Sequence, residues 1–345
     1  MGELRGRSLL AFGIVCVVWG STYLAIRVGV ESLPPFLMAG VRFVTAGLLL
    51  GGIALFFRKE ALPTRRADWG TLALAGVLLL CAGNGLVVWA EQYVDSGTAS
   101  IYVVTVAIWS ACFDALVPGG KTRFSGRLAA GLLLGLAGTA VLTGATPRAL
   151  LSADLRGPVA LILASGAWAF GSVYLKRHPV GVSFTMSATV QMLAGGLALT
   201  AVGLLRGEQE LWHPTQASLA ALGYLVVFGS IVGFTAYGYA LSHASPTVVG
   251  TYAYVNPVVA VLLGWLLLDE PLSPRKIVAM AVILGAVLWI QRAVQPAASA
   301  RTRPVGTEPP AERRPSPRLE RRSWPRAAGE RQARKLPAGH GDGLA

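Results

Sequence analysis

Few residues of this chain could do chemistry, and the charged ones lie in or beside long apolar segments. Arg42 and Asp114 fall clearly inside such segments, where a charge at the centre of a bilayer costs roughly 2.5–3.5 kcal/mol. Arg42 could hold an anionic substrate or a cluster of helix carbonyls, or it could tie its helix to a neighbour. Asp114 could pair with Lys121 or Arg123, or it could titrate in a proton-coupled process, as could the loop residue Glu91.

Uncharged polar and aromatic side chains in mid-segment are better candidates for lining a cavity, because they offer hydrogen bonds without an ionic cost. Each tryptophan among them could equally pack between helices or lie in an interfacial belt. Pro257 removes a backbone donor within its segment and predicts a helix kink there. The predicted cavity residues are Trp19, Ser21, Tyr23, Asn84, Tyr102, Trp168, Ser172, Tyr252 and Asn256.

Motifs for catalysis and for metal binding are missing from the sequence. It contains no Walker loop, no His-Glu-x-x-His and no Gly-x-Ser-x-Gly. Cys16, Cys81 and Cys112 all fall inside apolar segments, with spacings that match no zinc site and an odd count that argues against a disulfide framework. We therefore expect no catalytic residue, no metal and no cofactor.

The composition demands a bilayer. Of the 345 residues, 54% are hydrophobic and only 14% are charged, and the mean hydropathy is +0.57. So much apolar surface cannot be hidden in one soluble core, which argues against a soluble enzyme, a DNA-binding protein or a secreted disulfide scaffold. The net charge of +13 is spread over short loops and a basic tail. This placement fits membrane orientation better than a nucleic-acid partner.

Ten apolar runs are long enough to span a membrane, which takes roughly 20 residues each. No connection between them is long enough to form a domain, so any function must be built from the helices themselves. The runs are 8–27, 36–57, 70–90, 97–117, 126–144, 158–175, 183–205, 219–241, 247–268 and 276–294.

Loop charges predict the orientation of the chain. If the N-terminus is cytoplasmic, twelve Lys and Arg residues of the loops lie inside and six lie outside, so both termini are predicted to be cytoplasmic. Residues 295–345 are rich in proline and arginine and poor in aliphatic residues, which predicts a disordered basic cytoplasmic tail.

The two halves of the chain resemble each other. A Gly-Ser-x-Tyr-Leu sequence begins at Gly20, after Trp19, and again at Gly171, after Trp168. Matched positions recur at an offset of 150 residues, and Tyr102 with Tyr252 is one such pair.

Each half therefore contains five helices, one repeat over residues 8–144 and the other over 158–294. Five is an odd number, so the second repeat enters the membrane from the opposite side. Such inverted repeats are typical of transporters that work by alternating access. The sequence thus predicts an all-α membrane protein of ten transmembrane helices in two inverted five-helix repeats.

These motifs resemble a known family. The run from Trp19 to Arg27, followed by Arg42-Phe43, is similar to the opening of the EamA-type drug/metabolite transporters, and Asn256-Pro257 with the segment 268–272 is similar to the end of that family's repeat. The first repeat departs from the pattern at Ala107, where the family tends to have proline. The resemblance covers residues 8–294 and implies ten helices, a central substrate cavity and movement of small metabolites across the cytoplasmic membrane.

Together these features predict a secondary transporter, an exporter of small polar metabolites such as amino acids or drug-like compounds, in the cell membrane. A membrane-embedded enzyme using Asp114 or Glu91 is one alternative, and a non-transporting membrane scaffold is another. The expected partners are a small-molecule substrate and the lipid bilayer. Coupling to a proton or a counter-substrate, and assembly as a homodimer, are left open by the sequence.

Overall fold

The computed structural model describes residues 4–94, 96–118, 120, 122–144, 154–268 and 271–294. These residues form helices and no strand, and ten of the helical spans are long and apolar enough to cross a membrane. The predicted fold class is confirmed. The predicted tail, 295–345, lies outside the described residues.

The first repeat begins with α1 (Arg7–Val30) and contains five spans. After α1 come α2 (Pro35–Gly52) with η1 (Ile53–Phe57), α3 (Arg66–Gly76) with η2 (Val77–Gly85) and α4 (Leu86–Ala90), α5 (Ser96–Val103) with α6 (Thr105–Leu116), and α7 (Gly126–Thr143).

The second repeat begins with α9 (Arg156–Arg177) and has the same five parts. After α9 come α10 (Phe184–Leu205) with the short η3 (Glu208–Leu211), α11 (Gln216–Tyr224) with η4 (Leu225–Val232) and α12 (Gly233–His243), α13 (Pro246–Gly250) with α14 (Tyr252–Leu268), and α15 (Pro274–Val294).

The repeats share irregularities as well as helices. The third span of each contains a π-helical segment, η2 in one and η4 in the other. The fourth span of each is interrupted, at Val104 between α5 and α6 and at Thr251 between α13 and α14. Pro257 lies inside α14, so the interruption of that span comes before the proline. Since π-helical turns often occur at functional sites, the third spans are where a site is expected.

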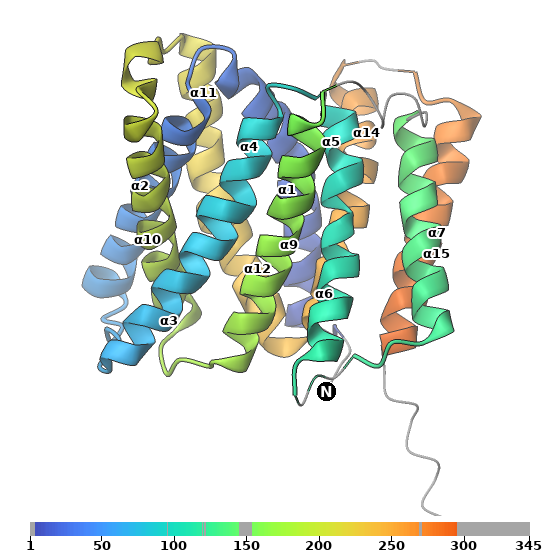
Figure 1. Ribbon diagram of the computed structural model, residues 1–345, viewed down its shortest axis with the longest axis horizontal. Coiled ribbons are helices and arrows are strands. Elements are labelled where there is room, and N and C mark those ends of the chain that lie inside the picture. The colour runs from blue at the N-terminus through green and yellow to red at the C-terminus, as the bar shows by residue number, and fades with distance from the viewer. Residues whose placement is uncertain are drawn as a thin grey trace, which may run out of the picture. The chain divides into compact units, whose positions relative to one another are not determined.

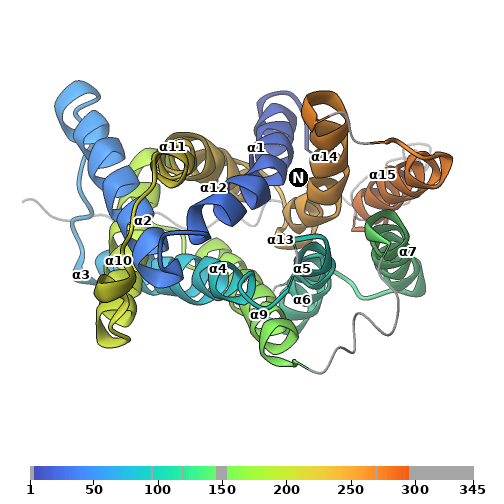
Figure 2. The ribbon, with the colours of Figure 1, turned by 90° about the horizontal axis from the view of Figure 1, so that it is seen from above.

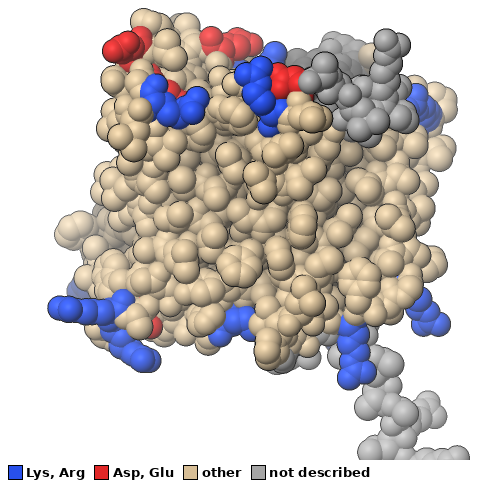
Figure 3. All heavy atoms as spheres, in the orientation of Figure 1, with Lys and Arg blue, Asp and Glu red and all other residues tan. Residues whose placement is uncertain are grey.

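The spans run side by side between two loop-bearing faces (Figure 1). We name the face where α1 begins the proximal face and the face where α1 ends the distal face. The charged side chains visible in Figure 3 gather at these two faces, and the band between them is apolar. This distribution is the one that a membrane-embedded bundle requires.

Glycines allow the two repeats to pack closely. Helices α2 and α10 lie against each other on one side of the bundle, and α7 and α15 pair on the other (Figure 2). A Cβ atom on Gly47 would lie 2.9 Å from the Leu193 side chain, and one on Gly196 would lie 2.7 Å from the backbone nitrogen of Val44. Small residues are therefore what lets the α2 and α10 backbones approach, as in membrane helix pairs generally.

Candidate substrate site

Five aromatic rings meet in the middle of the bundle and form what we call the central aromatic cluster. They are Trp19 of α1, Trp168 of α9, Phe234 and Tyr237 of α12, and Tyr252 of α14. The two tryptophans meet edge to face, with ring centroids 5.3 Å apart and planes at 85°. Tyr252 packs against Trp19 at 4.9 Å, and Tyr237 packs against Trp168 at 5.3 Å. Edge-to-face contacts such as those of Trp19 with Trp168 and with Tyr252 are favourable for aromatic pairs.

The polar atoms of the tryptophans are hydrogen-bonded. The indole nitrogen of Trp19 donates to the carbonyl of Gly229 at 2.9 Å. The indole nitrogen of Trp168 donates to the Tyr237 hydroxyl at 3.1 Å, and that hydroxyl lies 2.5 Å from Ser172 Oγ. Ser172 in turn donates to the backbone carbonyl of Trp168. These bonds form a closed ring that fixes the Trp168 side chain.

Each tryptophan packs against a glycine of the other repeat. A Cβ on Gly83 would lie 3.0 Å from the Trp168 ring, and a Cβ on Gly233 would lie 2.9 Å from Cδ1 of Trp19 and closer still to its indole nitrogen. Gly83 lies within η2 and Gly233 directly follows η4, so the two glycines occupy matched places in the third spans. The cluster therefore has an approximate twofold arrangement, built from both repeats.

A small cavity of about 70 Å³ lies on the distal side of the cluster. Its wall on α1 runs from Trp19 toward the distal end at Ile26, and its wall on α9 includes Ala164 and Ser165, which precede Trp168. The residues that line it include six of the nine predicted cavity residues: Trp19, Tyr23, Asn84, Trp168, Tyr252 and Asn256.

Three predicted residues do not line this cavity. Ser21 donates to the carbonyl of Val18 at 2.6 Å and contacts the Tyr224 hydroxyl, so its polar group is used between helices. Ser172 uses its hydroxyl in the closed ring of hydrogen bonds with Trp168 and Tyr237. Tyr102 is half-buried and packs beside the core rather than in the cavity wall.

A second cavity, of about 240 Å³, lies on the proximal side of the cluster. It is lined by Lys176 near the end of α9, Ser187 near the start of α10, and Ser242 near the end of α12, all close to the proximal face. Phe234 lines both cavities. The central aromatic cluster is thus a partition between a distal and a proximal cavity.

Arg42 reaches the distal cavity from α2. Its side chain is 97% buried, since only 3% of the residue is exposed. The Nε atom donates to Ser230 Oγ at 2.8 Å, and the guanidinium carbon lies 4.6 Å from the centre of the Phe43 ring. The Nη1 atom is buried with no hydrogen-bond partner, and so is the Oδ1 atom of Asn84 in the same wall.

Glu91 follows α4 at the distal face and is only 1% exposed. Neither of its carboxyl oxygens has a hydrogen-bond partner. The Arg27 guanidinium donates to the backbone carbonyl of Glu91 at 3.2 Å and lies close enough to act on its charge. Burial raises the pKa of Glu91 to about 8, and the positive charge of Arg27 opposes this shift.

Asp114 is buried at the proximal end of α6 and pairs with the second repeat. It accepts a hydrogen bond from the backbone nitrogen of Thr122 at 2.9 Å and one from Arg177 at 3.3 Å. The expectation that Lys121 or Arg123 would supply its ion pair is wrong for Arg123, and Lys121 lies outside the described residues. Arg177 can form this ion pair because α9 packs along α6 and ends at the same face.

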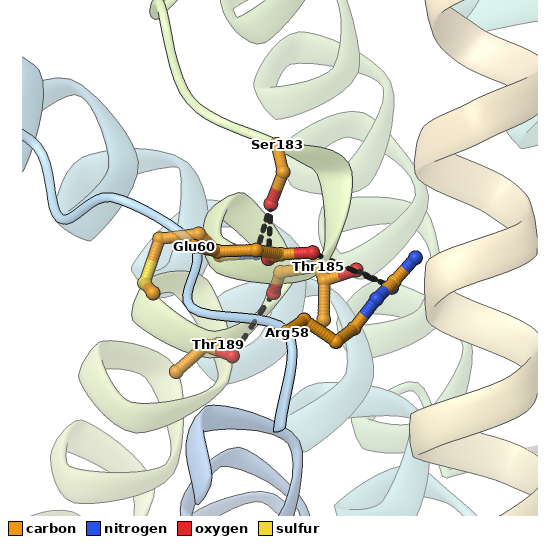
Figure 4. Close-up of polar contacts among 6 residues, drawn as sticks. Arg58, Glu60, Ser183, Thr185 and Thr189 are labelled. Carbon is orange, nitrogen blue, oxygen red and sulfur yellow. Dashed lines mark hydrogen bonds and ion pairs between the residues drawn. The ribbon is translucent and has the colours of Figure 1, made fainter. Parts of the chain in front are cut away.

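A second polar contact between the repeats lies at the proximal face, near the start of α10 (Figure 4). Arg58, just after η1, donates to Thr185 Oγ1 at 2.9 Å and forms an ion pair with Glu60 at 3.4 Å. Glu60 accepts a hydrogen bond from Ser183, the residue that caps α10. These contacts tie the loop after the second span to the second repeat.

Sequence reasoning missed Phe234 and Tyr237. The repeat comparison finds identical residue types at matched positions, but the counterparts of these two aromatics in the first repeat are Asn84 and Val87. All four positions adjoin the cluster or the distal cavity. Comparing positions rather than residue types would have found them.

Known proteins resemble this chain over most of its length. The profile of the EamA-like transporter family matches residues 7–144 and again 155–292. The chain is 43% identical over 294 residues to a protein named as the uncharacterized inner membrane transporter YedA of Escherichia coli (strain K12), a match that covers 83% of this chain and 92% of that protein. It is 26% identical over 289 residues to a probable terminal-alkyne amino-acid exporter of Streptantibioticus cattleyicolor, covering 83% and 94% of the two chains. A solved crystal structure with 21% sequence identity has the same fold, with a TM-score of 0.67 over 85% of this chain and 100% of that one.

The chain therefore belongs to the EamA-like transporter family, and the resemblance seen in its motifs is confirmed. It is a multi-pass membrane transporter, and the residues that the structure describes form ten helical spans long and apolar enough to cross the membrane.

The hydrogen-bonded ring around Trp168 can be tested by Tyr237→Phe. This change leaves the buried indole N–H of Trp168 without its acceptor, which we expect to lower the free energy of unfolding by about 1–3 kcal/mol. Tyr254→Phe is the matched control, because the buried Tyr254 hydroxyl donates a single bond to the carbonyl of Leu132 outside the cluster, and its loss should cost only about 1 kcal/mol. Denaturant unfolding in detergent measures both. Equal losses would contradict the ring.

Proposed function

We propose that this protein is a secondary transporter that exports small polar metabolites, such as amino acids or drug-like compounds, by alternating access. The observation that carries the proposal is the pair of cavities on opposite sides of the central aromatic cluster. Because both repeats contribute rings to that partition, a rocking movement of one repeat against the other would open one cavity while closing the other.

The size and lining of the distal cavity support a polar substrate that widens its site on entry. A volume of about 70 Å³ holds a few water molecules rather than a metabolite. Its lining combines apolar rings with the amides of Asn84 and Asn256 and the Tyr23 hydroxyl. The name of the amino-acid exporter among the relatives supports amino acids as one substrate class.

Loss of either central tryptophan should lower transport. Metabolite profiling of medium from overexpressing and deleted cells first identifies an exported compound. For Trp19→Ala and Trp168→Ala, we then expect the initial rate per folded molecule to fall at least several-fold, because each ring forms part of the wall and of the partition. Fluorescence size exclusion supplies the amount of folded protein. Trp265→Ala is the control, since that side chain is 49% exposed on α14. Normal rates in both cluster variants would contradict the proposed site.

We propose that the proximal face is cytoplasmic, so that both termini lie inside the cell. Support comes from the loop charges, because most of the acidic side chains visible in Figure 3 lie at the distal face while the proximal face is mainly basic. The described Lys and Arg residues near the proximal face are Arg5, Arg7, Arg58, Lys59, Arg65, Arg66, Arg123, Arg127, Lys176, Arg177 and Arg292.

Reporter fusions test this orientation. Fusions after Arg66 and Arg123 should report the cytoplasm, and fusions after Arg156 should report the outside. A phosphatase and a fluorescent reporter, active on opposite sides, measure each site independently. The reverse pattern would contradict a cytoplasmic proximal face.

We propose Glu91 as the group through which a proton couples to transport. Two observations support this proposal. The Glu91 carboxyl is buried and neither of its oxygens has a hydrogen-bond partner, and its charge acts on Tyr23, a residue that lines the distal cavity. The charged and titratable groups that act on it are Arg27 and Tyr23, both from α1. With a pKa of about 8, the folded protein holds this carboxyl neutral at pH 7, and loss of the proton places a charge next to the cavity.

The raised pKa of Glu91 sets the sign of its pH dependence. A carboxyl whose pKa is higher in the folded than in the unfolded state favours folding most at low pH, and this contribution is lost as pH rises toward 8. We expect wild-type stability relative to Glu91→Gln to fall between pH 5 and pH 9, by at most about 1.4 kcal/mol per pH unit. Transport by Glu91→Gln should lose the wild-type change near pH 8. Glu31→Gln, an exposed carboxyl of the distal face, should behave as wild type. An unaltered pH profile in Glu91→Gln would contradict proton coupling here.

A further inference from the structure

Arg42 brings an unpaired positive charge to the wall of the distal cavity. The ion pairs formed by the described residues join Arg58 with Glu60, Arg156 with Asp154 and Arg177 with Asp114, and none involves Arg42. An arginine stays protonated in proteins, and a buried charge carries an effective desolvation penalty of several kcal/mol. Neutral contacts with Ser230 and Phe43 leave that charge uncompensated.

The guanidinium is arranged to accept a further partner. Ser230 uses Nε, which leaves the two terminal nitrogens, and Nη1 is buried without a hydrogen bond. Gly229 makes room for the group, because a Cβ there would lie 2.8 Å from Nη2. Two N–H groups at the end of an arginine match the two oxygens of a carboxylate and form short, charge-assisted hydrogen bonds with it.

The buried acidic residue of the distal face does not supply this partner. Glu91 is buried at the distal face, but both of its oxygens lack hydrogen-bond partners and it is not among the residues that line the cavity. Asn84, which shares the wall with Arg42, adds a second unsatisfied atom, an amide oxygen that can accept from an N–H group. The central tryptophans provide an apolar surface beside both.

We propose that Arg42 binds the carboxylate of the transported metabolite, so that the substrates of this protein are carboxylate-bearing metabolites with an N–H donor for Asn84. This inference rests on the proposed transport function and names its substrate class. Arg42 thereby selects carboxylates against their amides and against simple amines, which would meet an uncompensated like charge.

The test compares carboxylates with their primary amides on purified full-length protein in nanodiscs. L-Alanine with L-alaninamide and L-phenylalanine with L-phenylalaninamide are the probes, and protection against thermal unfolding is the readout. Wild-type protein should bind each carboxylate at least about tenfold more tightly than its amide, because a charge-assisted hydrogen bond contributes about 1.5–3 kcal/mol.

Variants assign the preference to Arg42. Arg42→Gln should abolish it, Arg42→Lys should retain part of it, and Gly229→Ala should weaken it by displacing the guanidinium. Arg206→Gln removes an exposed arginine of the distal face that stacks near Phe36, and it should leave the preference unchanged. If Arg42→Gln does not fold, Arg42→Lys and Gly229→Ala assign the preference, and equal binding of carboxylates and amides by the wild-type protein overturns the proposal without any variant.

Three outcomes would overturn the proposal: equal protection by carboxylates and amides, protection by neither, or a preference that survives in Arg42→Gln. The proposed function fails separately. A protein that exports only neutral or cationic metabolites keeps the transport function and loses this inference. A protein that binds carboxylates but exports no compound keeps the inference and loses the transport function.

Discussion

The contact between Trp19 and Trp168 is the interaction on which the rest of the structure depends. Two large rings from different repeats can meet in mid-membrane only if the neighbouring helices have no side chain in the same space. Gly83 and Gly233 meet this requirement. Their indole nitrogens must also be satisfied, since unpaired donors at that depth are costly. The partner atoms, the Gly229 carbonyl within η4 and the Tyr237 hydroxyl, come from the same span, α11 to α12. Packing and hydrogen bonding therefore favour the same arrangement of the two tryptophan side chains.

This arrangement explains why the cavities are separate. The rings lie between the distal and the proximal cavity, whose walls combine apolar side chains with polar ones such as Asn84 and Ser187. At the proximal face the repeats are further joined by Asp114 with Arg177 and by Glu60 with Ser183. In the alternating-access mechanism that we propose, a change of access must therefore break polar contacts at the proximal face as well as shift the aromatic partition.

Buried charges in this protein have two different fates. Asp114 is compensated by a backbone donor and an arginine of the other repeat, which makes it a structural link. Arg42 and Glu91 keep atoms without partners. Buried polar groups without partners are few in native proteins, and each needs an explanation. Under the function that we propose, Arg42 and Glu91 make the distal half the region that meets solutes and protons, whereas the compensated Asp114 belongs to the framework.

Composition and the lengths of the apolar runs were enough to predict ten spans, and residues matched between the two halves predicted the inverted repeats. The family was predicted from the resemblance of motifs such as the run from Trp19 to Arg27. Six cavity residues, among them Trp19 and Trp168, followed from depth and symmetry. Depth and symmetry did not predict that Arg177 pairs with Asp114 or that Tyr237 joins the central aromatic cluster. They also did not predict that Ser21, Tyr102 and Ser172 lie outside the wall of the distal cavity. Which face of a helix points inward depends on its rotation, and η2, η4 and the interruptions at Val104 and Thr251 alter that rotation within a span. Only contacts between helices far apart in the sequence decide it.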